Sequence, residues 1–269
     1  MQYVRLKCST SMIAINDRLF YHPEILEFYL TNEDLKDEAL LLDRIDYVQS
    51  KGAKVYLHHP MEYNGVPQDI LDPDKERRSY YFRSTEQLVR LGEDKGVKVI
   101  VHAHYANTAS SDSTFANLVS MRKRIDEILT FGRNTILWEN TIEGLFSYDN
   151  EKLIEYLIEP LNLPLVVDIS HTFISFKGNN DKLAETLERT QKYANYYHVV
   201  DSDGQADGLI VGKGAIDFRK VYPYIINKDF IFEISLHPDY DDCTPMIKSI
   251  EYFNKLVREA DNRTRIISE

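Results

Sequence analysis

The sequence predicts a single (β/α)8 barrel that spans residues 1–269. The chain has the length of one such barrel, and 43% of its residues are hydrophobic, which is enough for a full core. Eight short apolar runs alternate with helical patterns at the spacing of β–α units. No Gly/Ser linker or low-complexity tract separates two halves. We therefore expect one domain with a parallel barrel inside and helices outside.

Each predicted strand is a short run rich in β-branched and aromatic residues. Such runs have near-continuous apolar character because a parallel barrel buries both faces of its strands. The eight runs lie at 4–8, 26–30, 54–58, 99–102, 135–139, 163–168, 196–200 and 229–235.

Helices are predicted between these strands from caps and apolar spacing. Thr31 or Asn32 is expected to cap the helix that ends at Lys51-Gly52, and Ser84 with Gln87 forms a capping-box pattern. Asp181 and Thr244 are the expected caps of two later helices. The remaining ranges are 85–94, 114–131, from Asp149 or Asn150 to near Pro160, 182–193, and a final helix from Thr244.

The stretch 59–84 has no clear periodicity and is longer than ordinary connections, so it is a candidate lid or binding loop. It contains Arg77, Arg78 and Arg83 among aromatic residues. A guanidinium group is a planar bidentate donor, so these arginines are candidates for holding a phosphate or stacking on a sugar or base. The alternative is that they are solvated at the rim of the barrel.

Composition restricts the partners and the compartment. A net charge of −11 and a pI near 5.3 disfavour non-specific binding to nucleic acid or anionic membrane. The two cysteines, Cys8 and Cys243, form no CxxC pair, so no disulfide framework or zinc ribbon is indicated. No signal peptide or membrane-spanning run is recognisable, and we expect a cytoplasmic protein.

The strongest functional signal is that six of the strands end on histidine, aspartate or glutamate. Ionisable groups are rarely buried unless they are paired or bind a metal, so convergent strand ends indicate one shared site. At or near these strand ends, Glu139, Asp168, His198 and Glu233 supply three carboxylates and one imidazole. This set suits Zn²⁺ or Mn²⁺, and also Mg²⁺ or Co²⁺, and is too rich in oxygen for a structural zinc site.

The third strand ends in two adjacent histidines, His58 and His59. Alternation along a strand sends them to opposite faces, so only one of them points into the barrel. We expect His59 to be that residue.

The order of these motifs resembles the xylose-isomerase-like barrel superfamily. The resemblance covers nearly the whole chain and depends on Glu139-Asn140-Thr141, Asp168-Ile169-Ser170-His171, His198-Val199-Val200-Asp201-Ser202, Gly212-Lys213-Gly214 and Glu233. It implies a metal bound by Glu139, Asp168, His198 and Glu233, with the two glutamates as opposed acid and base. Further candidates for a second metal or for substrate are His59, His102, His171, Asp201 and Lys213.

The resemblance leaves two catalytic functions open. The first is a metal-dependent isomerase or epimerase of a small sugar, sugar phosphate or polyol. The second is an endonuclease-IV-like phosphodiesterase that acts on abasic-site DNA. A third reading is a barrel that binds metal or ligand without turnover.

Departures from both branches affect this choice. The endonuclease branch has Asp-x-His shortly before Gly-Lys-Gly, whereas this chain has Asp207-Gly208-Leu209, so a complete three-metal site is not expected. Some ketose epimerases have a second glutamate where this chain has Leu145, and an arginine shortly after His198 that is absent here. We therefore expect a small sugar-like substrate that differs from theirs, with nucleic acid as the less favoured partner.

Overall fold

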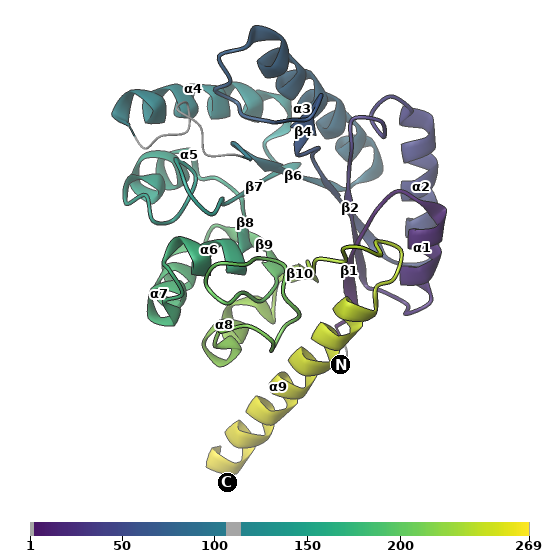
Figure 1. The fold of residues 1–269 in the computed structure, drawn as a ribbon, viewed down its shortest axis with the longest axis vertical. Helices are drawn as coiled ribbons and strands as arrows, with labels where there is room; N and C mark the ends of the chain where they lie inside the picture. Colours follow the sequence, from purple (N-terminus) through teal and green to yellow (C-terminus); the bar gives the residue numbers. More distant parts are fainter. Residues whose placement is uncertain (1–2, 106–113, 269) are drawn as a thin grey trace.

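The computed structural model describes residues 3–105 and 114–268. Within these residues, eight parallel strands close into a barrel in the order β1-β10-β9-β8-β7-β6-β3-β2, which confirms the predicted fold (Figure 1). Observed and predicted strand ends differ by at most three residues. The barrel strands are β1 (Arg5–Cys8), β2 (Ile25–Tyr29), β3 (Lys54–His58), β6 (Lys98–His102), β7 (Ile136–Glu139), β8 (Leu165–Asp168), β9 (Ala194–Val199) and β10 (Asp229–Phe232).

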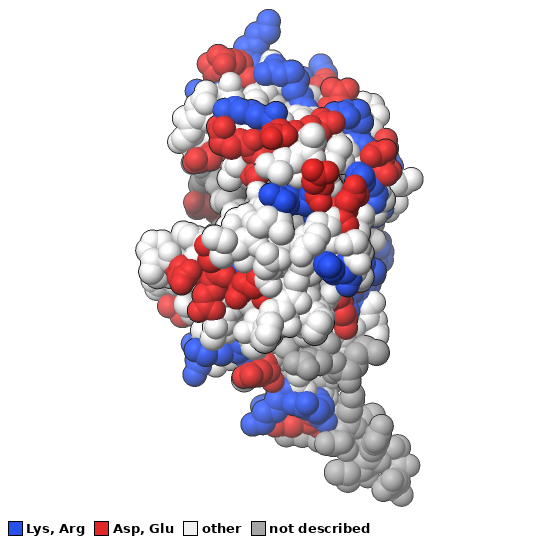
Figure 2. All heavy atoms as spheres, turned by 90° about the vertical axis from the view of Figure 1, so that its right-hand side faces the viewer, with Lys and Arg blue, Asp and Glu red and all other residues white. Residues whose placement is uncertain are grey.

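Helices surround the barrel, and the last of them, α9, extends past it (Figure 1). Along the described chain, none of the helices is both long and apolar enough to cross a membrane. On the face that carries α1 and α2, acidic and basic side chains are interspersed (Figure 2). The helices are α1 (Met12–Leu19), α2 (Glu38–Ser50), α3 (Lys75–Lys95), α4 (Phe115–Gly132), η1 (Ile154–Ile158), α5 (Glu159–Leu161), α6 (Ile169–Ser175), α7 (Asn180–Thr190), α8 (Phe218–Ile225) and α9 (Thr244–Ser268).

The helix expected at 85–94 begins ten residues earlier, at Lys75. Asp74 caps it by accepting a hydrogen bond from the backbone N–H of Arg77 at 2.9 Å. Ser84 lies inside this helix and donates its hydroxyl to a backbone carbonyl one turn earlier, so the capping-box prediction was wrong. Before the helix, β4 (Glu62–Tyr63) and β5 (Val66–Pro67) form a short antiparallel hairpin. The predicted loop 59–84 is therefore partly hairpin and partly helix.

Other caps also differ from the predictions because a nearby side chain makes the capping bond. Asp37, not Thr31 or Asn32, accepts the bond from Leu40 N–H that opens α2. Asn179, not Asp181, caps α7. The helices α1, α6 and α8 were not predicted, because they have only eight, seven and eight residues and so give only about two turns of apolar periodicity.

An apolar layer fills the barrel interior toward the N-terminal ends of the strands. Seven strands each contribute one buried side chain to a cluster that is separate from the core between the barrel and its helices. Two residues further along each of these strands, the next interior side chain is polar, because strand side chains alternate between faces. The apolar layer therefore sets the position of a polar layer directly above it. Its members are Ile25, Tyr56, Ile100, Leu137, Val166, Tyr196 and Ile231.

The loop after β9 is folded around the buried carboxylate of Asp201. Its Oδ2 accepts from the N–H groups of Gly212 and Gly214 at 2.8 and 2.9 Å. Its Oδ1 accepts from Ser202 N–H at 2.8 Å and Ile216 N–H at 3.2 Å. A Cβ on Gly214 would overlap Asp201 Oδ1, so this position requires glycine. The Gly-Lys-Gly motif thus encloses a carboxylate of its own chain.

We predict that Asp201→Ala lowers the free energy of unfolding by about 3 kcal/mol, because it leaves several backbone N–H groups without an acceptor. Chemical denaturation of the variant measures this loss. Asp203→Ala is the matched control, since Asp203 is exposed and accepts only local bonds from Gln205 and Ala206. Equal losses in the two variants would contradict the role assigned to Asp201.

Candidate active site

A layer of ionisable side chains lies above the apolar layer, with one residue from each barrel strand or its end. It contains four carboxylates, three imidazoles and one lysine. Burying such groups is unfavourable unless each has a partner, so their contacts define the site. The layer consists of Lys7, Glu27, His58, His102, Glu139, Asp168, His198 and Glu233.

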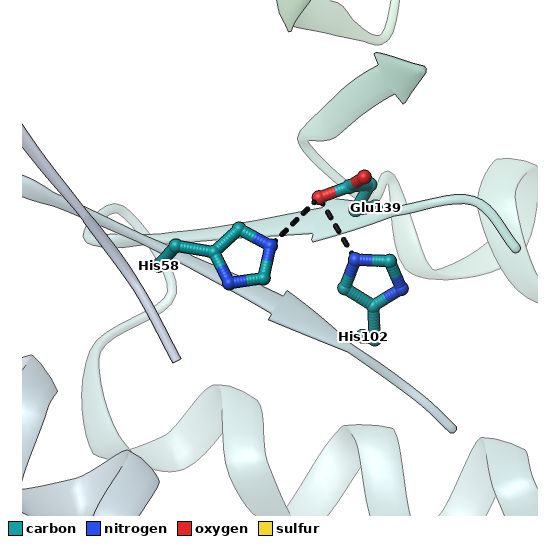
Figure 3. Close-up of side chains that lie close together, drawn as sticks. All are labelled: His58, His102 and Glu139. Carbon is teal, nitrogen blue, oxygen red and sulfur yellow. Dashed lines mark hydrogen bonds and ion pairs between the residues drawn. The ribbon is translucent and has the colours of Figure 1, made fainter. Parts of the chain in front are cut away.

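Glu139 lies at the centre of this layer and contacts two histidines through one carboxylate oxygen. Its Oε2 is 3.2 Å from His58 Nε2 and 2.9 Å from His102 Nε2 (Figure 3). The Nδ1 of His58 lies 3.0 Å from the backbone carbonyl of His59, which can only accept a hydrogen bond. Nδ1 therefore carries a proton, and Nε2 lies at hydrogen-bond distance from Glu139.

The prediction that His59 points into the barrel was wrong. His59 is fully buried on the outer face of the strand, and its Nε2 lies 2.8 Å from Ser84 Oγ on α3. Burial lowers the pKa of His59 to about 3, so the ring is neutral. Tyr56 is in the apolar interior layer, and alternation from Tyr56 selects His58.

The four predicted ligands come together on the other side of Glu139. One ligand atom from each of Glu139, Asp168, His198 and Glu233 lies within 4.8 Å of every other. His198 Nδ1 is 3.1 Å from Glu139 Oε1, 2.5 Å from Glu233 Oε2 and 3.8 Å from Asp168 Oδ2. Three carboxylates thus face a single imidazole nitrogen.

These contacts shift the pKa values in opposite directions. Burial alone would raise the pKa of Glu139, but His102 and His198 hold it well below its usual range. Burial alone would lower the pKa of His198, but Glu139 and Glu233 raise it well above its usual range. Burial raises the pKa of Asp168 to about 7. The group therefore holds protons that a bound cation would displace.

Two further groups of ligand atoms flank these four residues. One is formed by His58, His102 and Glu139, and the other by Asp168, His171 and Asp207. His171 Nε2 is 3.3 Å from Asp207 Oδ2, and its Nδ1 is 2.9 Å from the carbonyl of Asn140. Asn140 in turn accepts a bond from Asp168 N–H at 2.8 Å. The second residue of the Glu-Asn-Thr motif therefore ties β7 to β8 and helps to place His171.

Lys7 on β1 forms an ion pair with Glu233 at the end of the neighbouring strand β10. Although burial alone would lower the pKa of Lys7, Glu233 raises it, so the lysine stays charged. Burial alone would raise the pKa of Glu233, but His198 and Lys7 lower it. Glu233 is thus an ionised carboxylate between an imidazole and an ammonium group.

A cavity of about 670 Å³ opens beside this layer, and Lys7, His58, His102, Glu139, His171, Asp207 and Glu233 all line it. Its other walls are largely aromatic or aliphatic and include Tyr29, Met61, Tyr105, Ile142, Leu236 and Tyr240. The volume is that of a pocket for a small molecule. Among the described lining residues, Lys7 is the only lysine or arginine.

The remaining predicted residues lie away from this cavity. Asp201 is bonded to its own loop, and Lys213 is exposed. Arg77 forms a bidentate pair with Asp72 at 2.6 and 2.8 Å. Arg78 and Arg83 line a separate groove on the outer helices. The structure thus gives these arginines no contact with the cavity.

Sequence reasoning missed Lys7, Glu27 and Asp207. Lys7 and Glu27 are paired across β1 and β2 and belong to the interior layer. The alternation of side chains along β2 identifies Glu27 as an interior residue, since it follows Ile25 by two positions. No sequence pattern indicates that Asp207 lies at the site, because it belongs to a loop whose conformation depends on Asp201.

The sequence matches one known protein family. The family model of the xylose isomerase-like TIM barrel matches residues 47–256. The chain belongs to the xylose isomerase-like TIM barrel family. No curated protein matches the sequence.

Several solved structures share this xylose isomerase-like barrel. An L-ribulose 3-epimerase matches with a TM-score of 0.75 and 14% identity, covering 100% of this chain and 99% of its own. A D-tagatose 3-epimerase-like protein matches with 0.73 and 17% identity over 98% and 100%. The TTHB071 protein of Thermus thermophilus, soaked with ZnCl2, matches with 0.72 and 17% identity over 96% and 99%. These likenesses establish the shared fold.

We predict that stability falls between pH 7 and pH 5 partly because of His59. Its folded pKa of about 3 lies below the unfolded value of 6.5, so its stabilising effect is present above pH 6.5 and is lost as the pH falls. The loss to pH 5 is about 2 kcal/mol. His59→Gln should remove this part of the pH dependence in urea denaturation and leave metal binding intact, whereas His58→Gln should weaken metal binding. The reverse pattern would restore His59 to the site.

We also predict that Mn²⁺ binds at least about tenfold more weakly at pH 6 than at pH 8, because the cation must displace the proton of Asp168, whose pKa is about 7. Protons on His171 and His198 act in the same direction, since carboxylates raise their pKa values. Isothermal titration calorimetry at the two pH values gives the ratio. An affinity that does not depend on pH would rule out these ligands.

Proposed function

We propose that this chain is a divalent-metal-dependent isomerase or epimerase of a small sugar- or polyol-type substrate, acting by proton transfer next to a carbonyl. One observation carries the proposal. Glu139 and Glu233 converge on His198 Nδ1, at 3.1 and 2.5 Å, and both line a cavity of small-molecule size. Such a proton transfer requires a carboxylate that accepts the proton from carbon and a carboxylic acid that donates one, and Glu139 and Glu233 are placed to serve as this pair.

The residues fit a divalent cation. Glu139, Asp168, His198 and Glu233 offer three carboxylates and a ring nitrogen within 4.8 Å of one another. Oxygen ligands with one imidazole suit Mn²⁺ or Zn²⁺. The polar layer has four carboxylates and one lysine, so a dication would offset its excess negative charge. When bound, the metal would polarise the substrate carbonyl and acidify the neighbouring C–H.

The chain's own residues supply the proton acceptor and donor. Lys7 and His198 keep Glu233 ionised, and His102 and His198 do the same for Glu139, so either carboxylate can take up a proton from carbon. To complete an epimerisation, the second glutamate must itself carry a proton taken up from solvent, which it gives to the opposite face of the carbon while the first glutamate keeps the proton it removed. The apolar walls limit the access of water to the reacting carbon, so this carbon exchanges hydrogen through the two glutamates.

The charge of the cavity supports an unphosphorylated substrate. Lys7 is paired with Glu233, and the arginines expected to hold phosphate lie elsewhere. The sequence 106–113, between the described segments, contains no lysine or arginine. Phosphate recognition in proteins normally uses such cations. The names of the epimerase structures with this fold support a sugar-type substrate as well.

A second candidate function is metal-dependent phosphodiester hydrolysis. The observation that favours it is that the three groups of ligand atoms overlap: Glu139 belongs to two of them, and Asp168 belongs to two. Shared carboxylates are typical of sites that hold metals a few ångström apart for an in-line displacement. The near absence of cations around the cavity weighs against a nucleic acid substrate.

We predict that Glu139→Gln and Glu233→Gln each slow solvent deuterium incorporation into a ketose by at least about 100-fold, because each removes a group that transfers the proton. NMR of ketoses incubated with Mn²⁺-loaded enzyme in D₂O measures the exchange. Glu143→Gln is the control, since Glu143 also lines the cavity but belongs to none of the three ligand groups.

Retained exchange in either glutamine variant would contradict the acid–base pair. If no ketose or polyol exchanges, abasic-site DNA is the next substrate. Cleavage of that DNA with two or three metals per chain would establish the second function in place of the first.

A further inference from the structure

Glu27 on β2 is a buried carboxylate that the proposed proton transfer does not use. It is fully buried inside the barrel, two residues beyond Ile25 of the apolar layer. Its Oε2 lies 3.0 Å from His198 Nε2. Its Oε1 has no hydrogen-bond partner among the described residues. The imidazole of His198 is therefore the principal partner of this carboxylate.

The two nitrogens of His198 face different groups. Nε2 points at Glu27, while Nδ1 points at Glu139, Glu233 and Asp168. An ionised carboxylate can only accept hydrogen bonds, so the contact with Glu27 requires a proton on Nε2. When His198 is neutral, this leaves the lone pair on Nδ1, directed at the three carboxylates.

The cost of burying Glu27 argues against a purely structural role. Removing a carboxylate from water costs several kcal/mol, and one hydrogen bond offsets this only in part. Lys7, its neighbour in the register of β1 and β2, bonds to Glu233 instead. An apolar side chain would fill this place with less penalty. The contact that distinguishes Glu27 from an apolar residue is its hydrogen bond with the ring of His198.

We propose that Glu27 is a positioning residue that holds His198 with Nε2 protonated and Nδ1 free to bind the divalent cation. The inference rests on the proposed metal-dependent function and adds a residue to it. Histidine ligands commonly donate their second N–H to a carboxylate, which fixes the tautomer and raises the basicity of the ligand nitrogen. Glu27 would not touch the metal or the substrate.

The test uses Zn²⁺ binding and the His198 ring itself, so it does not depend on turnover. In ¹⁵N-histidine-labelled, Zn²⁺-loaded protein, the His198 signals, assigned with His198→Gln, should show a slowly exchanging Nε2–H and a zinc-bound Nδ1. Glu27→Gln should weaken Zn²⁺ binding by about 10- to 100-fold, measured by chelator competition, because an amide no longer dictates the tautomer. Asp229→Asn should leave Zn²⁺ affinity unchanged. It removes a barrel carboxylate that bonds Lys54 and Tyr56 and does not touch His198.

These measurements test the role of Glu27 separately from the metal-dependent function. Unchanged Zn²⁺ affinity in a folded Glu27→Gln protein, or zinc bound through His198 Nε2, would overturn the role of Glu27 and leave the metal-dependent function standing. No Zn²⁺ or Mn²⁺ binding by the wild-type protein would overturn both. If Glu27→Gln does not fold, the wild-type spectrum alone decides, since the proposal requires the proton on Nε2.

Discussion

The alternation of side chains along the strands of a closed barrel is the constraint on which this site depends. Because interior side chains recur every second residue, the seven apolar residues that fill the lower barrel place seven ionisable residues in one layer above them. Lys7 completes the layer from β1. Residues far apart in sequence thus meet without any loop having to bring them together. The barrel backbone is also rigid, which keeps the carboxylates and imidazoles at fixed separations.

This layer concentrates charge where water is largely excluded. Glu139 contacts His58, His102 and His198, so a single carboxylate joins the two sides of the layer. Glu233 is held between His198 and Lys7. These two acids are thus ionised next to a cation or a hydrogen-bond donor. The net charge of the layer remains negative. We propose that a divalent cation offsets this excess charge, and the single lysine among the described lining residues of the cavity supports an unphosphorylated substrate.

Much of the fold and part of the site could be predicted from the sequence. The strands were recognisable because parallel barrel strands are continuous apolar runs, and Glu139, Asp168, His198 and Glu233 are conspicuous at their ends. The sequence also allows His58 and Glu27 to be predicted as interior residues, because each follows an interior apolar residue by two positions. At the end of the third strand, the alternation of side chains selects His58 and not His59, because His58 follows the interior residue Tyr56 by two positions.

Other features depend on contacts that sequence patterns do not show. The carboxylate of Asp201 holds the Gly-Lys-Gly loop, so a motif that resembles a substrate site serves the fold. Arg77 pairs with Asp72, and Asp74 caps α3 well before the apolar periodicity begins. The direct test of the metal centre is a crystal structure of the Zn²⁺-loaded protein with data collected on both sides of the zinc absorption edge. We predict an anomalous peak enclosed by Glu139, Asp168, His198 and Glu233. Zinc located only at surface residues, with His198 still bonded to Glu233, would contradict it.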